Sequence, residues 1–396
     1  QGELSRLIHL YVVGVFTAIT FSQAGMVLKW LRDRGAHWRR NIAVNGVGVA
    51  TTGVVLAIVA VTQFTLGAWI VLAAIPLIVM VFLAIRRHYE RVARRLRAGL
   101  TVPPEGQEHT FVVLVPDLGL ATAEAVAYLR AVRPTRVFPV HIGDPDSFEE
   151  TSVGWSSLAP RFGELQPLER GTSGLARAVR RLLREHARDP GSFHTVVVPE
   201  SVQKRSMLAM LRPRAALWLK ASLLFEPDVV VTNVPLLPEE RAQVERWADH
   251  PVEPPRSVVL VPISAVHGAT VRAVAYARTL HATTLEALFF SGDAEDVEPV
   301  IRAWGDLRLG IPLAVIEDPF RDLGGSLLAE IRKHRVRGDT VVTIVIPEFV
   351  VDRWWEHLLH NQTGFYLKRL LLFEPGVVVT SVPFHLGAVP TPERAS

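Results

Sequence analysis

LLFEPDVVVTNVP, residues 223–235, returns almost unchanged as LLFEPGVVVTSVP, residues 371–383. The two stretches differ at two of thirteen positions and lie 148 residues apart. Each contains a run of β-branched residues that ends at a proline, which is typical of a buried strand. A chain that carries the same strand twice raises the question of whether it carries a whole domain twice.

The repeat extends well beyond this strand. Further pairs match at the same spacing of 148 residues: TVVVPE (195–200) with TIVIPE (343–348), and AVAYLR (125–130) with AVAYAR (273–278). The run VVLVP begins at 112 and again at 258, so the second copy has two extra residues in its first loop. We therefore predict two copies of one domain, at 108–240 and 255–388, joined by a proline-rich linker.

Each copy alternates short apolar runs with longer amphipathic stretches. In the first copy the apolar runs lie near 111–115, 136–141, 164–168, 193–198 and 228–234. Alternation of strands and helices predicts a parallel sheet that helices cover on both faces, and uniformly apolar strands fit that burial. The expected fold of each copy is a doubly wound α/β domain with a five-stranded parallel sheet.

The repeated fifth strands, VVVTNVP and VVVTSVP, carry no charge. A long apolar strand at an exposed sheet edge favours aggregation. We predict that the two strands pair antiparallel across a two-fold axis, within the chain or with a neighbouring subunit. The alternative is a plain tandem of domains in which helices cover both edges.

The first hundred residues have a different character. Residues 41–85 contain no Asp, Glu, Lys or Arg, and one membrane helix needs only about 20 such residues. We predict transmembrane helices at about 7–28, 43–63 and 66–85, followed by a basic juxtamembrane segment that completes a unit at 1–98. The chain starts at Gln with an apolar span close behind, so we expect it to be the C-terminal part of a longer protein.

Arginines and lysines give the expected orientation. They occur between the first two spans and again in RRHYERVARRLR, residues 86–97, whereas the turn between the second and third spans has no charge. Positive loops stay in the cytoplasm, so we predict a multi-pass protein of the cell membrane whose residues after about 86 are cytoplasmic. The basic run is interpreted as an anchor on anionic membrane lipid rather than a nucleic-acid patch.

Composition excludes several function classes. The chain has no cysteine, which rules out disulfides and thiol catalysis within it. The net charge of +4 is explained by the arginines that flank the membrane spans, so no nucleic acid polymer is expected as a partner.

His357 and His360 lack a third ligand at suitable spacing, so no metal is expected. Ser264 and His267 lack an acid for a triad, and we predict no enzyme activity and no cofactor.

The two soluble copies resemble the universal stress protein domain. VVLVPDLG and VVLVPIS are similar to its first strand and turn, with Asp117 at the position of its usual acidic residue and Ile263 in the second copy. The glycine-rich phosphate loop of its ATP-binding members is absent from both copies, so ATP binding in the usual mode is not expected. Asp117, Ser264 and Arg353 are the candidate nucleotide-binding residues. Two basic positions recur at the 148-residue spacing: Lys220 with Lys368, and Arg205 with Arg353. These side chains are also candidates to contact phosphates, and the alternative is that they lie on solvated helix faces.

The first span, LYVVGVFTAITFSQAGM at 10–26, resembles a late membrane helix of KimA-type potassium transporters. That resemblance implies the last three helices of a LeuT-like fold, uptake of potassium ion coupled to proton, a homodimer, and regulation by cyclic di-AMP in the cytosol. It also implies that Tyr11 helps form the potassium site. Hydroxyls on this helix make Thr17 and Ser22 candidates for an ion path, whereas the alternative is a packing stripe.

Two other functions stay open at this point. One is an amino acid permease with a stress-protein-like tail, and the other is a membrane-tethered nucleotide sensor that transports nothing. The sequence favours a proton-coupled potassium importer with a nucleotide-responsive cytosolic domain.

Overall fold

The computed structural model describes most of the chain, and it divides into two compact units, Gln1–Val92 and Ala93–Ser396. Each unit is considered by itself. The described residues are 2–35, 37–66, 68–98, 108–168, 174–186, 192–201, 219–220, 222–223, 226, 229–238, 256–293, 295, 297–335, 340–350 and 362–385.

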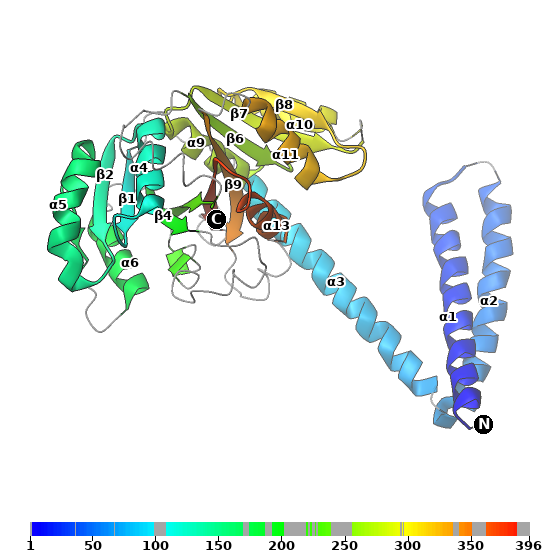
Figure 1. Cartoon of the computed structure of the whole chain (residues 1–396). Helices are drawn as coiled ribbons and strands as arrows, with labels where there is room; N and C mark the ends of the chain where they lie inside the picture. The colour runs from blue at the N-terminus through cyan, green and yellow to red at the C-terminus, as the bar shows by residue number, and fades with distance from the viewer. Residues whose placement is uncertain are drawn as a thin grey trace, which may run out of the picture. The chain divides into compact units, whose positions relative to one another are not determined.

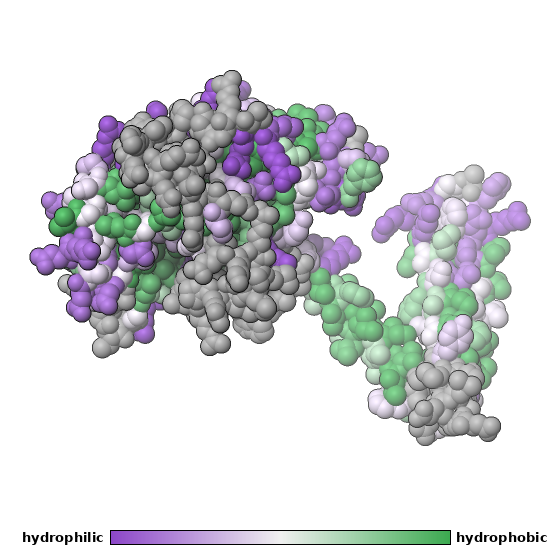
Figure 2. All heavy atoms as spheres, viewed as in Figure 1, coloured by the Kyte–Doolittle hydropathy of each residue, from purple (hydrophilic) through white to green (hydrophobic). Residues whose placement is uncertain are grey.

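The first unit is helical, as its composition predicts. Its elements are α1 (Gly2–Arg32), α2 (Trp38–Thr62), the short 3-10 helix η1 (Phe64–Leu66) and α3 (Ala68–Ala98). Within the described residues, three stretches are long and apolar enough to cross a membrane: Tyr11–Arg32, Trp38–Thr62 and Trp69–Arg87. Apolar residues cover the middle of these helices in Figure 2, and α3 continues past its apolar stretch into the basic run.

The second unit alternates strands and helices (Figure 1). The first copy consists of β1 (His109–Val115), α4 (Leu120–Val132), β2 (Arg136–His141), η2 (Pro145–Ser147), α5 (Phe148–Leu158), η3 (Pro160–Phe162), β3 (Gln166–Pro167), α6 (Leu175–His186), β4 (Phe193–Ser201) and β5 (Val229–Leu236). The second copy consists of β6 (Arg256–Ile263), α9 (Gly268–Thr279), β7 (Thr284–Ser291), α10 (Val297–Leu307), β8 (Leu313–Glu317), α11 (Leu323–His334), β9 (Thr340–Val350), α13 (Gln362–Leu371) and β10 (Val377–His385).

The described strands form a single ten-stranded sheet in the order β3-β2-β1-β4-β5-β10-β9-β6-β7-β8. Every neighbouring pair is parallel except β5 and β10, which are antiparallel. The sequence predicted a five-stranded parallel sheet in each copy, and the structure shows the ten described strands as one large mixed sheet. The physical reason is that each fifth strand uses the other as its outer neighbour.

The seam between the copies confirms the predicted antiparallel pairing. Val231 lies opposite Ser381, Thr232 opposite Thr380, and Asn233 opposite Val379. Thr232 and Thr380 are fully buried, and their hydroxyl oxygens are 2.9 Å apart. These threonines are equivalent residues of the two copies, so the seam has a local two-fold axis at this pair.

The hydrophobic core on one face of the sheet is continuous across the seam. It contains buried side chains from β1, α4 and α5 of the first copy and from β6, α9 and α10 of the second. The other face has two separate cores: α6 covers the first copy, and α11 with α13 covers the second. The shared core therefore joins the two copies into one folding unit.

The structure shows what the repeated motif LLFEP contributes to each copy. Its first leucine is fully buried in both copies, as Leu223 and Leu371. Its glutamate forms an ion pair with the helix that precedes the fourth strand: Glu226 with Arg184 at 3.0 Å, and Glu374 with Arg332 at 3.3 Å. The repeated motif thus ties that helix to the start of the fifth strand in each half.

The Thr232–Thr380 contact gives the first prediction. Thr232→Val or Thr380→Val removes the buried contact between the two threonine hydroxyls at the seam, which costs about 1–3 kcal/mol of unfolding free energy. The double variant removes both hydroxyls, so it should lose less than the sum of the single variants, by about 1 kcal/mol. Urea unfolding of the whole chain in detergent, followed by tryptophan fluorescence, measures this coupling.

A matched control uses Thr122→Val and Thr270→Val. These threonines are also fully buried and equivalent, but each donates to a carbonyl of its own loop at 2.7 Å. Their effects should add. Additive effects at the Thr232–Thr380 pair as well would contradict the proposed role of that contact.

Candidate functional site

The candidate ion-path residues are spread along α1. Tyr11 is 71% exposed, and Ser22 is also exposed. Thr17 is buried, and its hydroxyl donates to the carbonyl of Val13 at 2.7 Å. The described residues therefore do not bring the three side chains together. Tyr11 and Ser22 leave their hydroxyls accessible, whereas that of Thr17 is occupied within its own helix.

The contact between α1 and α2 depends on polar and small residues that lie between these candidates. The hydroxyls of Thr20 and Thr52 are 3.0 Å apart across the helix pair. A Cβ added to Gly48 would lie 3.2 Å from the side chain of Gln23, so glycine allows close approach here. Thr20 and Gln23 thus support helix packing. The sequence signal for their partners was the run GVGVATTG at 46–53, which the sequence interpretation did not use.

Asp117 occupies the turn after β1, and its side chain is exposed. Its Oδ1 accepts a hydrogen bond from the backbone N–H of Gly119 at 2.8 Å. Its carbonyl accepts from Thr122 at 2.7 Å. This turn presents the carboxylate to solvent directly before α4, where a bound ligand could reach it.

Ser264 occupies the equivalent turn of the second copy and is also exposed. Nearby His267 caps α9: its Nδ1 accepts from the backbone N–H of Thr270 at 3.2 Å. Burial lowers the pKa of His267, which keeps the imidazole neutral for this role. A histidine committed to a helix cap is not placed to activate Ser264. Arg353, the third nucleotide candidate, lies outside the described residues, as do Arg205, His357 and His360.

Sheet topology separates Asp117 from Ser264. Strands β1 to β5 are parallel to one another, and so are β6 to β10, but the two sets run in opposite directions. The turns after β1 and β6 therefore lie at opposite ends of the strands. Ligands of doubly wound sheets bind at the carboxyl ends of the strands. The two residues would belong to two separate sites, one in each copy.

The recurring lysines pair with carboxylates. Lys220 is 2.6 Å from Glu200 of β4, and Lys368 is 2.6 Å from Glu348 of β9. The contacts are equivalent, and both glutamates come from the repeated PE at the end of the fourth strand. Lys220 and Lys368 were candidates for phosphate contacts. The structure instead places them in ion pairs with the end of the fourth strand of each copy.

A buried polar circuit crosses the seam. His109 and Thr195 belong to the first copy, and Tyr276 and Thr279 belong to the second. The Tyr276 hydroxyl is 3.0 Å from the Thr195 hydroxyl, which is 2.7 Å from His109 Nε2. On the other side of the ring, His109 Nδ1 is 2.6 Å from Thr279, whose hydroxyl donates to the carbonyl of Tyr276 at 2.6 Å.

A neutral His109 with its proton on Nδ1 satisfies this whole circuit. Tyr276 then donates to Thr195, Thr195 donates to Nε2, and Nδ1–H donates to Thr279. Burial, with smaller contributions from His194 and His281, lowers the pKa of His109 from 6.5 to about 3. Burial also raises the pKa of Tyr276 to about 12 and that of Tyr128 well above its usual value. These groups stay uncharged near neutral pH, and the hydrogen bonds of His109 and Tyr276 join the two copies.

Sequence reasoning missed this circuit. The second copy has Pro255 where the first has His109, so the histidine is not part of the repeat. The available sequence signal was this asymmetry: a histidine at the start of the first strand in the first copy only. Among the described residues, no group of three His, Asp or Glu side chains is placed to hold a metal ion.

Comparison with known proteins identifies the family. A family model described as the KimA potassium transporter C-terminal domain matches the chain twice, at residues 107–236 and 255–384. The chain belongs to this family. The two matches coincide with the two halves of the ten-stranded sheet, so the KimA family domain is present twice in tandem and the halves share their fifth strands.

A curated member of the KimA family gives the second comparison. The chain is 29% identical over 240 residues to a protein named potassium transporter KimA from Bacillus subtilis (strain 168). The match covers 59% of this chain and 39% of that relative. The chain thus spans well under half of the length of the curated relative that it matches.

The His109 circuit gives the second prediction. A histidine in the unfolded chain binds a proton below about pH 6.5, whereas folded His109 does so only near pH 3. The unfolded state therefore holds more protons between these values, and stability falls as the pH drops through this window. His109→Gln should abolish roughly 2–3 kcal/mol of the stability loss between pH 6.5 and 4. Urea unfolding at a series of pH values measures it.

Thr122→Val is the control, because it alters the buried core without removing a titratable group. It should keep the pH slope of the unsubstituted chain. If the His109→Gln curve also runs parallel to that of the unsubstituted chain, the histidine is not held neutral by burial and the hydrogen assignment above is wrong.

Proposed function

We propose that the chain is the C-terminal part of a potassium importer that couples uptake of potassium ion to protons. The observation that carries this proposal is the double match to the KimA C-terminal domain, together with three helices apolar enough to span a membrane directly before it. The relative named potassium transporter KimA supports the choice of ion. In this function the protein is a carrier rather than an enzyme, and it needs no cofactor.

The membrane part would supply the last three helices of a LeuT-like fold. Basic residues gather where α1 ends and α2 begins, and further arginines follow the apolar part of α3: Lys29, Arg32, Arg34, Arg39 and Arg40 are the residues at the first of these places. Because positive loops stay in the cytoplasm, residues after about 86 would be cytoplasmic, with the basic end of α3 against anionic membrane lipid. The Thr20–Thr52 contact suits such a pair of helices, since apolar surfaces alone do not drive association within lipid.

The cytosolic part would be a nucleotide-responsive regulator made of two stress-protein-like domains, at 108–240 and 255–388. The exposed turns at Asp117 and Ser264, at the carboxyl ends of their strands, support one ligand site in each copy. Cyclic di-AMP is the proposed ligand, because the resemblance to KimA-type transporters implies it. ATP is not proposed, because neither copy has the glycines that a backbone cradle for its phosphates needs.

A homodimer remains part of the proposal, with one constraint. The fifth strands already pair with each other inside the chain. Two chains must therefore associate through another surface, such as the membrane helices or the outer strands β3 and β8. An amino acid permease with this tail, or a membrane-tethered sensor that transports nothing, would be the outcome if the transport test below fails.

Tyr11 gives the third prediction. Tyr11→Phe in the full transporter that contains this chain should weaken potassium uptake affinity roughly tenfold, because one oxygen ligand of the cation is lost. The side chain is 71% exposed within the described residues, so loss of the hydroxyl should not disturb packing here. Uptake is measured in a host that depends on the protein for potassium.

The control is Tyr89→Phe, which removes a hydroxyl from the basic end of α3 and should leave the uptake affinity unchanged. Equal affinity in both variants would remove Tyr11 from the ion site.

The effector gives the fourth prediction. Titration of the whole chain in detergent with cyclic di-AMP should show binding at least tenfold tighter than that of ATP, by calorimetry. Asp117→Asn should alter the first-copy site, and Ser264→Ala the second. Binding of ATP with no binding of cyclic di-AMP would reverse the effector assignment, while potassium uptake in the preceding experiment would stand.

A further inference from the structure

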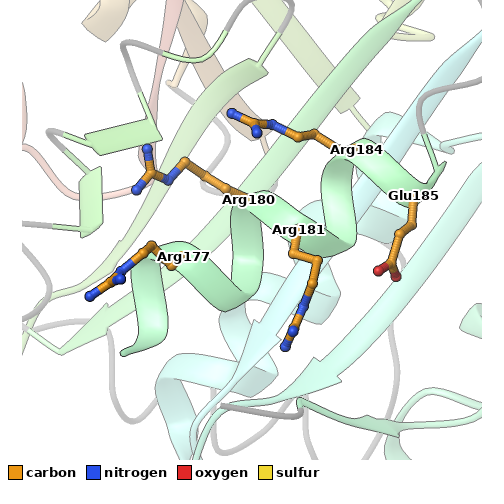
Figure 3. A pocket seen from close by; sticks show the side chains of 5 residues that line it. All are labelled: Arg177, Arg180, Arg181, Arg184 and Glu185. Atoms are coloured by element: carbon orange, nitrogen blue, oxygen red, sulfur yellow. The ribbon is translucent and has the colours of Figure 1, made fainter. Parts of the chain in front are cut away.

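Helix α6 of the first copy carries an arginine cluster with no counterpart in the second copy. Arg177, Arg180, Arg181 and Arg184, with Glu185, line a hollow of about 530 Å³ (Figure 3). The opposite side of α6 carries Val179 and Leu183, which are buried against the sheet. The hydrophobic anchoring of the helix thus leaves its arginine side facing the hollow.

The repeat supplies an internal comparison for these arginines. At the equivalent positions of α11, the second copy has Gly325, Leu328, Ala329 and Arg332. Only Arg332 is kept, and it forms the same ion pair with Glu374 that Arg184 forms with Glu226. The fold therefore needs one arginine on this helix, and the other three in the first copy exceed that need.

Among the described residues, the guanidinium groups of the hollow outnumber the carboxylates near them. Glu226 contacts both Arg180, at 3.2 Å, and Arg184, at 3.0 Å. With Glu185, two carboxylates lie among four guanidinium groups. The Nε of Arg180 is buried and has no hydrogen-bond partner among the described residues. A buried donor of this kind favours an acceptor, and the excess charge favours an anion.

We propose that the α6 hollow binds a phosphate-bearing anion. Guanidinium groups donate paired hydrogen bonds to phosphate oxygens, and arginine is the side chain best suited to this geometry. In Figure 3 the side chains of Arg177, Arg180 and Arg184 extend to one side of the helix, as expected for positions three and four residues apart. Three guanidiniums on one side suit a ligand with at least two phosphate charges.

The site differs from the proposed nucleotide sites. Glu226 directly precedes β5, so the arginines that contact it lie by the amino ends of the strands. Asp117 follows β1 at the carboxyl ends. The proposed anion site does not depend on what the protein transports, so the two proposals can be tested separately. Phosphate of this kind has two sources, the headgroups of anionic lipids and soluble phosphorylated compounds.

The fifth prediction tests the site with inorganic pyrophosphate. Calorimetric titration of the whole chain in nanodiscs of phosphatidylcholine should show binding that weakens as salt is added. Arg177→Gln with Arg181→Gln should weaken it at least tenfold. These two positions are chosen because Arg180 and Arg184 hold the poorly exposed Glu226, and their loss would also affect stability.

The control removes two positive charges elsewhere. Arg302→Gln with Arg321→Gln breaks exposed ion pairs of the second copy and should change pyrophosphate affinity less than twofold. A single Arg180→Gln variant, checked for normal thermal unfolding, should also bind more weakly. Equal affinity in all variants, or no binding to the unsubstituted chain, would overturn the proposal.

Nanodiscs with equal parts phosphatidylglycerol and phosphatidylcholine distinguish the sources. If lipid headgroups occupy the hollow, pyrophosphate affinity falls in these discs for the unsubstituted chain, and the α6 double variant shows no such fall. Unchanged affinity assigns the site to a soluble anion. Cyclic di-AMP binding should survive the α6 double variant, and its loss would overturn the separation of the two sites.

Discussion

The antiparallel pairing of β5 with β10 is the contact on which the rest of the α/β unit depends. Each strand is apolar and would otherwise end its sheet with unpaired backbone groups. Their pairing satisfies those groups and buries Thr232 against Thr380. It also brings α4 and α9 onto one face, where a single hydrophobic core crosses the seam. The two domains therefore form one packed unit rather than a tandem of separate domains.

Antiparallel pairing also places the two halves in opposite directions, which shapes function. The carboxyl ends of the strands, where ligands of such sheets bind, lie on opposite sides in the two copies. The exposed turns after β1 and β6 therefore lie apart rather than in one shared pocket. The duplication also shows which charged contacts recur. Ion pairs needed for folding occur twice, such as Glu226–Arg184 and Glu374–Arg332, whereas the extra arginines of α6 occur once.

The membrane unit follows a different physical rule. Lipid is as apolar as the helix surfaces, so close packing and polar contacts hold helices together. The Thr20–Thr52 contact and the approach of Gln23 to Gly48 are contacts of this kind. Among the described residues they leave the Tyr11 side chain exposed. In the α/β unit the polar circuit around His109 differs, because its hydrogen bonds join the two copies.

The sequence by itself determined the duplication, the strand and helix order of both copies and the three apolar spans. These features follow from local periodicity and self-similarity, which need no knowledge of distant contacts. It also pointed to the pairing of the fifth strands, since an apolar edge must be covered. Only the tertiary structure decided that the partner strand is in the same chain and that Asp117 and Ser264 lie at opposite ends of the strands. The His109 circuit and the hollow at α6 likewise depend on residues far apart in the sequence, whose contacts arise from strand order and helix packing.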